Sequence, residues 1–178
     1  MNLTQFQTLS KRTMPFGGEP ANQVEFENML GNYAMGLVGE IIELQMELIG
    51  RKDKEKIAYE IGDIAHYAIG LLTLANLEVP EHVEVPKSSF KLNDKMNSLL
   101  CNAGEIVEHS KKVIYHRHDF MKNIFWGALR ILSMLKDVAK HYGYKFSEVL
   151  DMNIDKLKTR YPDKFSVEDS IKRVDVNG

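Results

Sequence analysis

The chain has 178 residues, of which 44% are hydrophobic and 27% charged, and its formal net charge is −2. This composition is ordinary for a globular domain. The weak negative charge disfavours an extended nucleic-acid surface but leaves a phosphate substrate open, because a bound cation can supply positive charge. No apolar run reaches the roughly 18 residues of a membrane span, and the N-terminus lacks a secretory signal pattern. A single cysteine, Cys101, excludes an internal disulfide. We therefore expect a cytoplasmic protein without a membrane partner.

Long stretches of helix formers, with apolar residues at three- and four-residue spacing, lie between the five prolines. They predict an all-α fold, a bundle of about six helices without β-strands. In chain order we expect helices at about 2–13, 25–49, 53–77, 90–115, 119–142 and 146–160. Residues 1–165 are expected to form one domain, followed by a charged, loosely held tail at 166–178.

A short motif occurs twice and indicates an internal duplication. Gly39-Glu40-Ile41-Ile42-Glu43 recurs 65 positions later as Gly104-Glu105-Ile106-Val107-Glu108. Each copy lies in a long helical stretch, which is followed by a basic, polar turn and a second helix. We therefore expect two diverged copies of one helical hairpin, at about 25–83 and about 90–150.

Two pairs of carboxylates in the first copy are the candidates for chemistry. Glu40 and Glu43 are three residues apart, so a helix projects them from nearly the same face, and Glu60 and Asp63 repeat that spacing on the next helix. A short connection makes the two helices antiparallel, which can bring all four acids together. Carboxylates in an apolar cleft repel one another and lose solvation. A divalent cation removes that penalty, and an all-oxygen ligand set favours Mg²⁺, or Mn²⁺, over zinc.

Gly39 and Gly62 each stand beside one of these acids. Glycine costs about 1 kcal/mol inside a helix relative to alanine, and close helix approach or room for a ligand would explain that cost. A solvated helix face is the alternative for any single Glu-x-x-Glu pair, whereas two pairs on adjacent helices favour a metal site. Asp63 and His66 also have the spacing of half a di-iron site, but the second copy supplies no matching pair.

These residues resemble a known family. Gly39-Glu40-x-x-Glu43, then sixteen residues, then Glu60-Ile61-Gly62-Asp63, is similar to the signature of the MazG-like all-α nucleoside triphosphate pyrophosphohydrolases, which include dimeric dUTPases. Asn153-Ile154-Asp155-Lys156-Leu157-Lys158-Thr159-Arg160 resembles the last helix of that family, with its Asn-x-x-Lys-Leu-x-x-Arg pattern. The likeness covers most of residues 1–165.

The resemblance implies Mg²⁺-dependent hydrolysis of a nucleoside triphosphate, an NTP or dNTP, between its α- and β-phosphates. The products would be a nucleoside monophosphate and pyrophosphate. The metal ligands and catalytic residues that match the family are Glu40, Glu43, Glu60 and Asp63. The positions that match its substrate contacts are Lys56, Asn153, Lys156 and Arg160. The family also implies a homo-oligomer, a dimer. The alternative is a catalytically idle helical nucleotide-binding or interaction protein of the same fold.

The second copy departs from the family pattern. It keeps Glu105 and Glu108, but the stretch equivalent to the second acidic pair is Phe125-Trp126-Gly127-Ala128-Leu129-Arg130, which has no carboxylate. We therefore expect one metal site, built by the first copy and completed by the basic last helix. Glu105 and Glu108 are then solvated or salt-bridged remnants, or residues that close the active cleft. Trp126 is expected in the core, with stacking on a nucleobase as the alternative, and Cys101 is expected to be buried.

Overall fold

A computed structural model describes residues 1–77, 79–83 and 92–172. These residues form α-helices and short 3-10 turns without any strand, so the predicted all-α fold is confirmed. The 3-10 turns are Lys11–Thr13 and Pro15–Gly18. The α-helices are α1 (Leu3–Ser10), α2 (Gln23–Ile49), α3 (Lys54–Leu74), α4 (Leu92–His116), α5 (Met121–His141), α6 (Phe146–Arg160) and α7 (Val167–Lys172).

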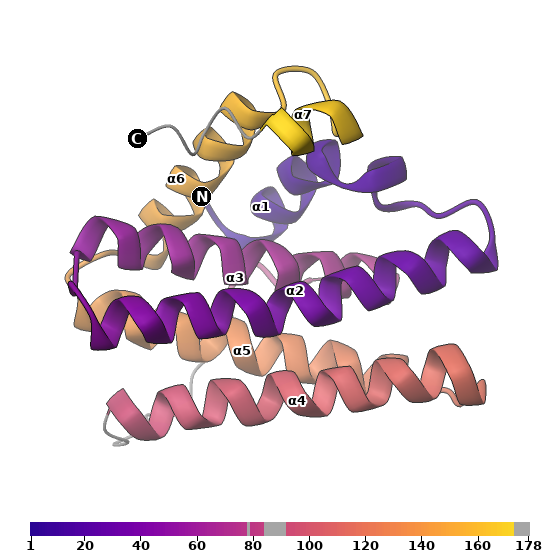
Figure 1. The fold of residues 1–178 in the computed structure, drawn as a ribbon, viewed down its shortest axis with the longest axis horizontal. Helices are drawn as coiled ribbons and strands as arrows, with labels where there is room; N and C mark the ends of the chain where they lie inside the picture. The colour runs from indigo at the N-terminus through magenta and orange to yellow at the C-terminus, as the bar shows by residue number, and fades with distance from the viewer. Residues whose placement is uncertain (78, 84–91, 173–178) are drawn as a thin grey trace.

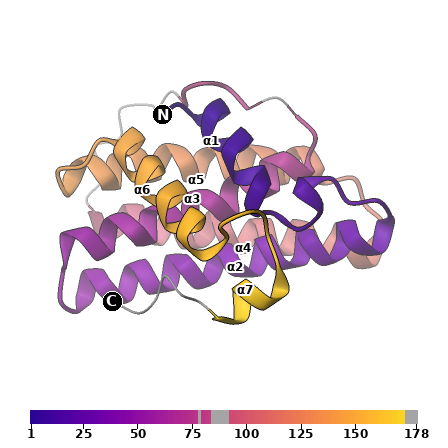
Figure 2. The same ribbon diagram turned by 90° about the horizontal axis from the view of Figure 1, so that it is seen from above.

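Two long helical hairpins form the body of the molecule. α2 and α3 make one layer, which packs on a second layer made of α4 and α5 (Figure 1). α1 and α6 lie on the outer side of the first layer and run across α3 (Figure 2). One hydrophobic core continues through both layers, with fully buried side chains such as Leu37, Ile61 and Leu132. The two hairpins occupy the parts of the chain that carry the repeated motif.

The observed helix ends differ from the predicted ones mainly near breaking residues. α1 stops at Ser10 because the chain tightens into a 3-10 turn before Pro15. α3 stops at Leu74, and Asn76 leaves the helical conformation with φ of 51°. Part of the tail that we expected to be loosely held forms α7. Its last residues, 173–178, lie outside the described residues.

Capping side chains fix where the first hairpin begins and turns. Asn22 accepts a hydrogen bond from the backbone N–H of Glu25 at the start of α2. Asp53 accepts from the backbone N–H groups of Glu55 and Lys56 at the start of α3. Such caps are worth about 1 kcal/mol each. The four residues between Ile49 and Lys54 therefore form a tight turn, which makes the helices antiparallel.

Two tyrosine–glycine contacts hold α2 and α3 close together. Tyr33 on α2 packs its ring on Gly70, and Tyr67 on α3 packs its ring on Gly36. The two rings meet edge to face with centroids 5.9 Å apart. Gly36 and Tyr67 lie one helical turn from the predicted acids. These contacts therefore help to set the spacing of the two helices where the acids project.

No described helix combines the length and the apolar character that crossing a membrane requires.

We expect Gly70→Ala to lower the free energy of unfolding by about 1–3 kcal/mol, because the added methyl group would overpack a buried interface. An ideal Cβ there would lie 2.4 Å from ring carbons of Tyr33. Gly104→Ala on exposed α4 is the matched control, since a Cβ there meets no atom within 4 Å. That variant should gain roughly 0.5–1 kcal/mol from the higher helix propensity of alanine. Urea unfolding measures both changes, and a stable Gly70→Ala variant would contradict the close packing.

Candidate functional site

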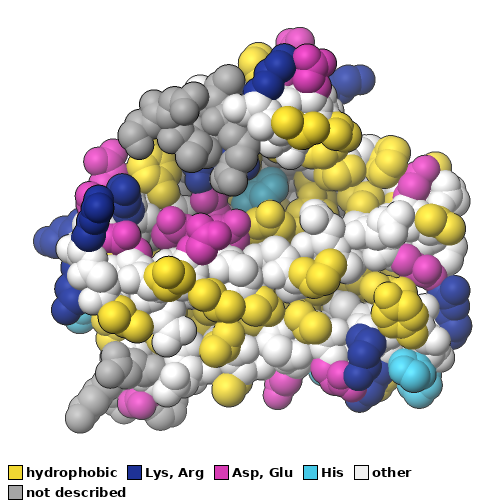
Figure 3. All heavy atoms as spheres, viewed as in Figure 1, with side chains coloured by type: hydrophobic (Ala, Val, Ile, Leu, Met, Phe, Trp, Pro, Cys, Tyr) yellow, Lys and Arg dark blue, Asp and Glu magenta, His cyan; other side chains and the backbone are white. Residues whose placement is uncertain are grey.

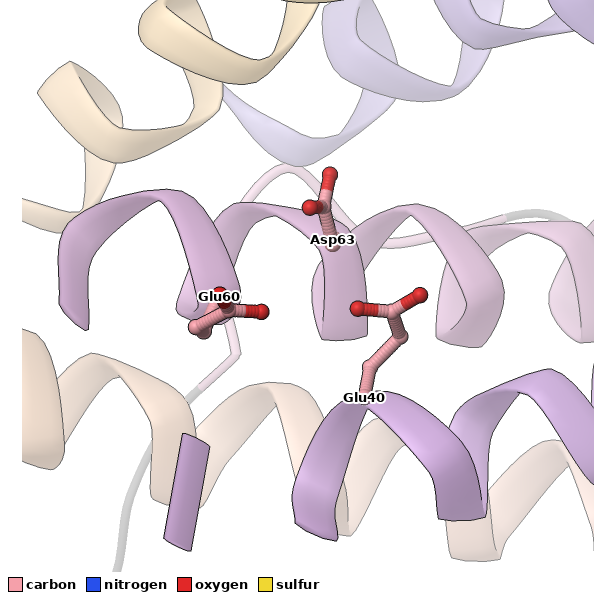
Figure 4. Close-up of side chains that lie close together, drawn as sticks. All are labelled: Glu40, Glu60 and Asp63. Atoms are coloured by element: carbon pink, nitrogen blue, oxygen red, sulfur yellow. The ribbon is translucent and has the colours of Figure 1, made fainter. Parts of the chain in front are cut away.

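Three of the four predicted carboxylates converge between α2 and α3. Glu40 projects from α2, while Glu60 and Asp63 project from successive turns of α3 (Figure 4). Each side chain offers an oxygen that lies within 4.8 Å of those offered by the other two. All three residues are partly buried. We call Glu40, Glu60 and Asp63 the acidic trio; Figure 3 shows acidic side chains gathered on this face of the molecule.

Glu43 lies outside the trio. Its side chain is exposed, although its charge is close enough to raise the pKa of Glu40 and Glu60. A step of three residues falls about 60° short of a full turn, and on α2 this rotation carries Glu43 to an exposed position, whereas on α3 both Glu60 and Asp63 stay partly buried. Glu43 is therefore turned toward solvent relative to Glu40. The structure brings it near the site without placing it among the converging oxygens.

Burial and mutual repulsion perturb the trio electrostatically. Burial raises the pKa of Glu40 to about 8, and the neighbouring charge of Asp63 adds to the increase. The same two causes raise the pKa of Glu60 to about 7. Without a divalent cation these carboxyls hold protons close to neutral pH. A cation between the three side chains would reverse that preference, because it favours their charged forms.

α6 supplies a cation and an amide to the same place. The Nζ of Lys156 lies 2.5 Å from Oδ2 of Asp63, and both side chains are about four-fifths buried. The Nδ2 of Asn153 donates a hydrogen bond of 2.7 Å to Oδ1 of Asp63. The last helix and the acids, predicted from separate parts of the sequence, thus meet in one site. Asn153 contacts an acid of the trio and is itself buried.

The two glycines beside the acids have different surroundings. A Cβ at Gly62 would lie 2.9 Å from Cβ of Asn153, so the missing side chain lets α6 approach α3. A Cβ at Gly39 would meet no atom within 4 Å. Close helix approach therefore accounts for Gly62, whereas Gly39 faces open space.

The remaining predicted substrate contacts lie at different distances from the trio. Arg160 follows Lys156 by one turn of α6, and its charge lowers the pKa of His66 and of Tyr67. The guanidinium thus acts on His66 and Tyr67, which follow Asp63 within about one turn of α3. Lys56 is exposed in the first turn of α3. It forms no ion pair within the described part of the chain.

His66 belongs to the surroundings of this site, although the sequence analysis considered it only as half of a di-iron motif. It follows Asp63 by one turn and contacts the rings of Tyr33 and Tyr67, with centroids 6.3 and 5.9 Å away. Burial, followed by the charges of Arg160 and Lys156, lowers the pKa of His66 to about 4. The imidazole is therefore neutral at pH 7, which suits a position among cations. Its three-residue spacing from Asp63 was the available signal.

The second hairpin holds no comparable acidic group in the residues that the structure describes. Glu108 forms ion pairs with Lys111 at 2.5 Å and with Lys112 at 3.4 Å. Oε2 of Glu105 lies 3.5 Å from a terminal nitrogen of Arg130. Both glutamates thus form salt bridges on the surface. This agrees with the expected alternative in which they are solvated or salt-bridged remnants.

Two expectations about the second hairpin are wrong. The side chain of Trp126 is 59% exposed and does not lie in the core, and Cys101 is exposed as well. Both residues were expected to be buried because of their hydrophobic character. These two residues fall between the buried positions of α4 and α5 and so reach the surface.

Comparisons with known proteins gave no match: no family model, no curated protein and no solved structure matches this chain. The residues of the site and their geometry therefore carry the functional interpretation.

We expect the metal-free protein to lose stability as pH rises from about 6.5 to 8. Glu40 and Glu60 have folded-state pKa values raised to about 8 and about 7, so the folded chain holds protons in this window that the unfolded chain has released. A raised pKa gives stability that is lost as pH rises through the folded-state value. Thermal unfolding in EDTA measures the effect, and Glu40→Gln should flatten the dependence. His66, with its pKa lowered to about 4, acts in the opposite direction below pH 6.5. A wild-type melting temperature that rises between pH 6.5 and 8 would contradict the account.

Proposed function

We propose that this protein is a Mg²⁺-dependent nucleoside triphosphate pyrophosphohydrolase. It cleaves an NTP or dNTP between the α- and β-phosphates and releases a nucleoside monophosphate and pyrophosphate. The observation that carries the proposal is the meeting of the acidic trio with Lys156 of α6. Carboxylates can bind the divalent cations that phosphoryl transfer requires. A lysine next to them can bind a phosphate group as a point charge. The likeness of both sequence motifs to the MazG-like family supports the same reaction.

The donor set of the trio fits a hard divalent cation. Three carboxylates from two helices supply only oxygen ligands, with offered oxygens within 4.8 Å of one another. Burial and the neighbouring acids raise the pKa values of Glu40 and Glu60 despite the charge of Lys156, so the site would favour further positive charge. Bound Mg²⁺ would neutralise these carboxylates and hold phosphate oxygens of the substrate. Among the described residues no histidine or cysteine joins the trio, so the set disfavours zinc.

The basic residues of α6 would act on the substrate. Lys156 pairs with Asp63 in this structure, and its single positive charge compensates less of the negative charge of the trio than a divalent cation would. A cation held by Glu40, Glu60 and Asp63 would compete with Lys156 for Asp63, and the ammonium group would then be able to contact a phosphate oxygen. Arg160, one turn further along α6, extends the positive surface. Both side chains would stabilise charge that develops on the phosphates during cleavage.

Glu43 is the carboxylate that we assign to the attacking water. It lies beside Glu40 and Glu60 but outside the trio, so ligation would leave it able to accept a proton. The oxygen of the water forms a bond to the α-phosphorus, and the bond from the α-phosphorus to the α–β bridging oxygen breaks. Pyrophosphate is the leaving group, and the nucleoside monophosphate is the other product. Asn153 serves as a positioning residue, because its amide fixes one oxygen of Asp63.

Incubation of the protein and Mg²⁺ with each NTP and dNTP, followed by product identification, tests the proposal. We expect monophosphate and pyrophosphate from at least one nucleotide. Release of inorganic phosphate and a nucleoside diphosphate would assign the site to a different bond. A lack of turnover with every nucleotide would favour the idle nucleotide-binding alternative.

We expect Glu40→Gln and Asp63→Asn each to abolish measurable turnover at limiting Mg²⁺ while helix content stays intact. Each change removes one charged ligand from an ion that demands near-ideal oxygen geometry. Steady-state kinetics and circular dichroism measure the two properties. The matched control is the double variant Glu105→Gln with Glu108→Gln, which alters the equivalent motif of the second hairpin. It should lose less than about tenfold in rate, or roughly 1.4 kcal/mol of barrier. A control as inactive as Glu40→Gln would show that both hairpins build the site.

We expect Lys156→Ala to lower kcat/KM by about a hundredfold, the typical loss when a charge-stabilising donor is removed. Mg²⁺ affinity should stay equal or rise, because Lys156 competes with the cation for Asp63. Lys158→Ala is the matched control on the same helix, since Lys158 is exposed and pairs with Asp155 at 3.2 Å. Calorimetric Mg²⁺ titration and kinetics separate the two effects. If Lys156→Ala kept full kcat/KM, the proposed phosphate contact would be wrong.

A further inference from the structure

A second candidate site lies between α4 and α5, away from the acidic trio. A cavity of about 350 Å³ opens there, lined by Glu105, His109, Asn123, Trp126 and Arg130. Its volume falls at the lower end of the range for small-molecule sites. None of its residues belongs to the machinery assigned to the proposed hydrolysis. The cavity therefore needs an explanation of its own.

The cavity occupies the place in the second hairpin that the acidic trio occupies in the first. α3 runs from 54 to 74 and α5 from 121 to 141, so both ends differ by 67 positions. That offset aligns Asp63 with Arg130. The repeated motif aligns Glu40 with Glu105 at an offset of 65. The contact of 3.5 Å between Glu105 and Arg130 thus repeats the juxtaposition of Glu40 and Asp63.

The substitution of an acid by an arginine changes what this place can bind. Arg130 pairs with Glu105, and its Nε donates a hydrogen bond of 2.8 Å to Oδ1 of Asn102. Two partners on α4 thus orient the guanidinium, which supplies a positive charge where a metal ion would supply it in the first hairpin. An oriented guanidinium matches the geometry of a phosphate group. The site can take an anion without a divalent cation.

Trp126 gives the cavity an aromatic wall. Its indole is 59% exposed, yet its orientation is set by edge-to-face packing on Phe125, with ring centroids 5.5 Å apart and planes at 84°. Phe125 is buried in the core of the hairpin. A large exposed ring with a fixed orientation presents its face to a planar ligand, and nucleobases stack on such faces regardless of sequence.

We propose that the cavity between α4 and α5 is a second, metal-independent ligand site that binds a nucleoside monophosphate. The base stacks on Trp126, its edge meets the carboxylate of Glu105 and the amide of Asn123, and the phosphate pairs with Arg130. A monophosphate suits this site better than a triphosphate, because it carries less negative charge and Arg130 must shift its pairing from Glu105 to a single phosphate group. The ligand belongs to the product class of the proposed hydrolysis, and only that choice of class rests on the proposed function.

Titration of the full-length protein with AMP, GMP, CMP and UMP in EDTA tests this site. Trp126 is the only tryptophan of the chain, so its emission reports binding in the cavity, and calorimetry gives the stoichiometry. We expect at least one monophosphate to quench the emission and to bind once per chain. Arg130→Gln should weaken binding at least tenfold. Lys136→Gln is the matched control, because it removes the same charge from an exposed position of α5 outside the cavity.

Asp63→Asn separates this site from the proposed hydrolysis. That variant disables the acidic trio, and we expect it to bind the monophosphate as the wild type does. Loss of binding in Asp63→Asn would place the nucleotide at the trio and overturn the proposal. So would unchanged affinity in Arg130→Gln, equal quenching by inorganic phosphate alone, or the absence of binding by all four monophosphates. Concentration-dependent self-association without nucleotide binding would assign Trp126 to a protein contact instead.

Discussion

The repulsion among three carboxylates at the interface of α2 and α3 is the constraint on which the rest of this structure depends. Glu40, Glu60 and Asp63 are close enough for burial and charge to raise two of their pKa values toward neutrality. Such a cluster persists in a folded chain when its carboxyls hold protons or when positive charge compensates them. α6 supplies part of that charge through Lys156. Its approach in turn requires Gly62, because a side chain there would collide with Asn153.

The two hairpins differ in the residues that face the glutamates of the repeated motif. In the first, acids face acids, and we propose a divalent cation between them. In the second, Arg130 stands where the first has Asp63, so a positive charge is part of the chain itself. The proposed metal site and the proposed anion site both rest on this difference. The repeated motif keeps its glutamates in both hairpins, while the residues that face them differ.

Most of the fold could be predicted from the sequence because helix periodicity and breaking residues are local signals. The i, i+3 spacing of Glu60 and Asp63 likewise predicted their common direction. The same spacing did not place Glu43 correctly. A three-residue step leaves a side chain rotated around the helix, and the packing of neighbouring helices decides whether the rotated side chain faces solvent. Trp126 was placed wrongly for a related reason, since hydrophobicity alone does not specify which side of α5 packs on the core.

Contacts between distant segments lay beyond what sequence spacing could supply. The hydrogen bond from Asn153 to Asp63 joins residues 90 positions apart. It depends on the angle at which α6 crosses α3, and no local pattern encodes that angle. The neutral state of His66 similarly arises from burial together with cations contributed by α6. These features tie the last helix to the acids and turn a group of carboxylates into an asymmetric site with a cationic side.

Diffraction from crystals grown with Mn²⁺ and a non-hydrolysable nucleoside triphosphate, measured near the manganese absorption edge, tests the central claim most directly. The account predicts an anomalous peak in contact with the carboxylates of Glu40, Glu60 and Asp63, with Lys156 moved from Asp63 toward a phosphate oxygen. Mn²⁺ replaces Mg²⁺ at oxygen sites and provides the signal. The absence of any manganese peak at the trio at saturating Mn²⁺, with Lys156 still paired to Asp63, would contradict it.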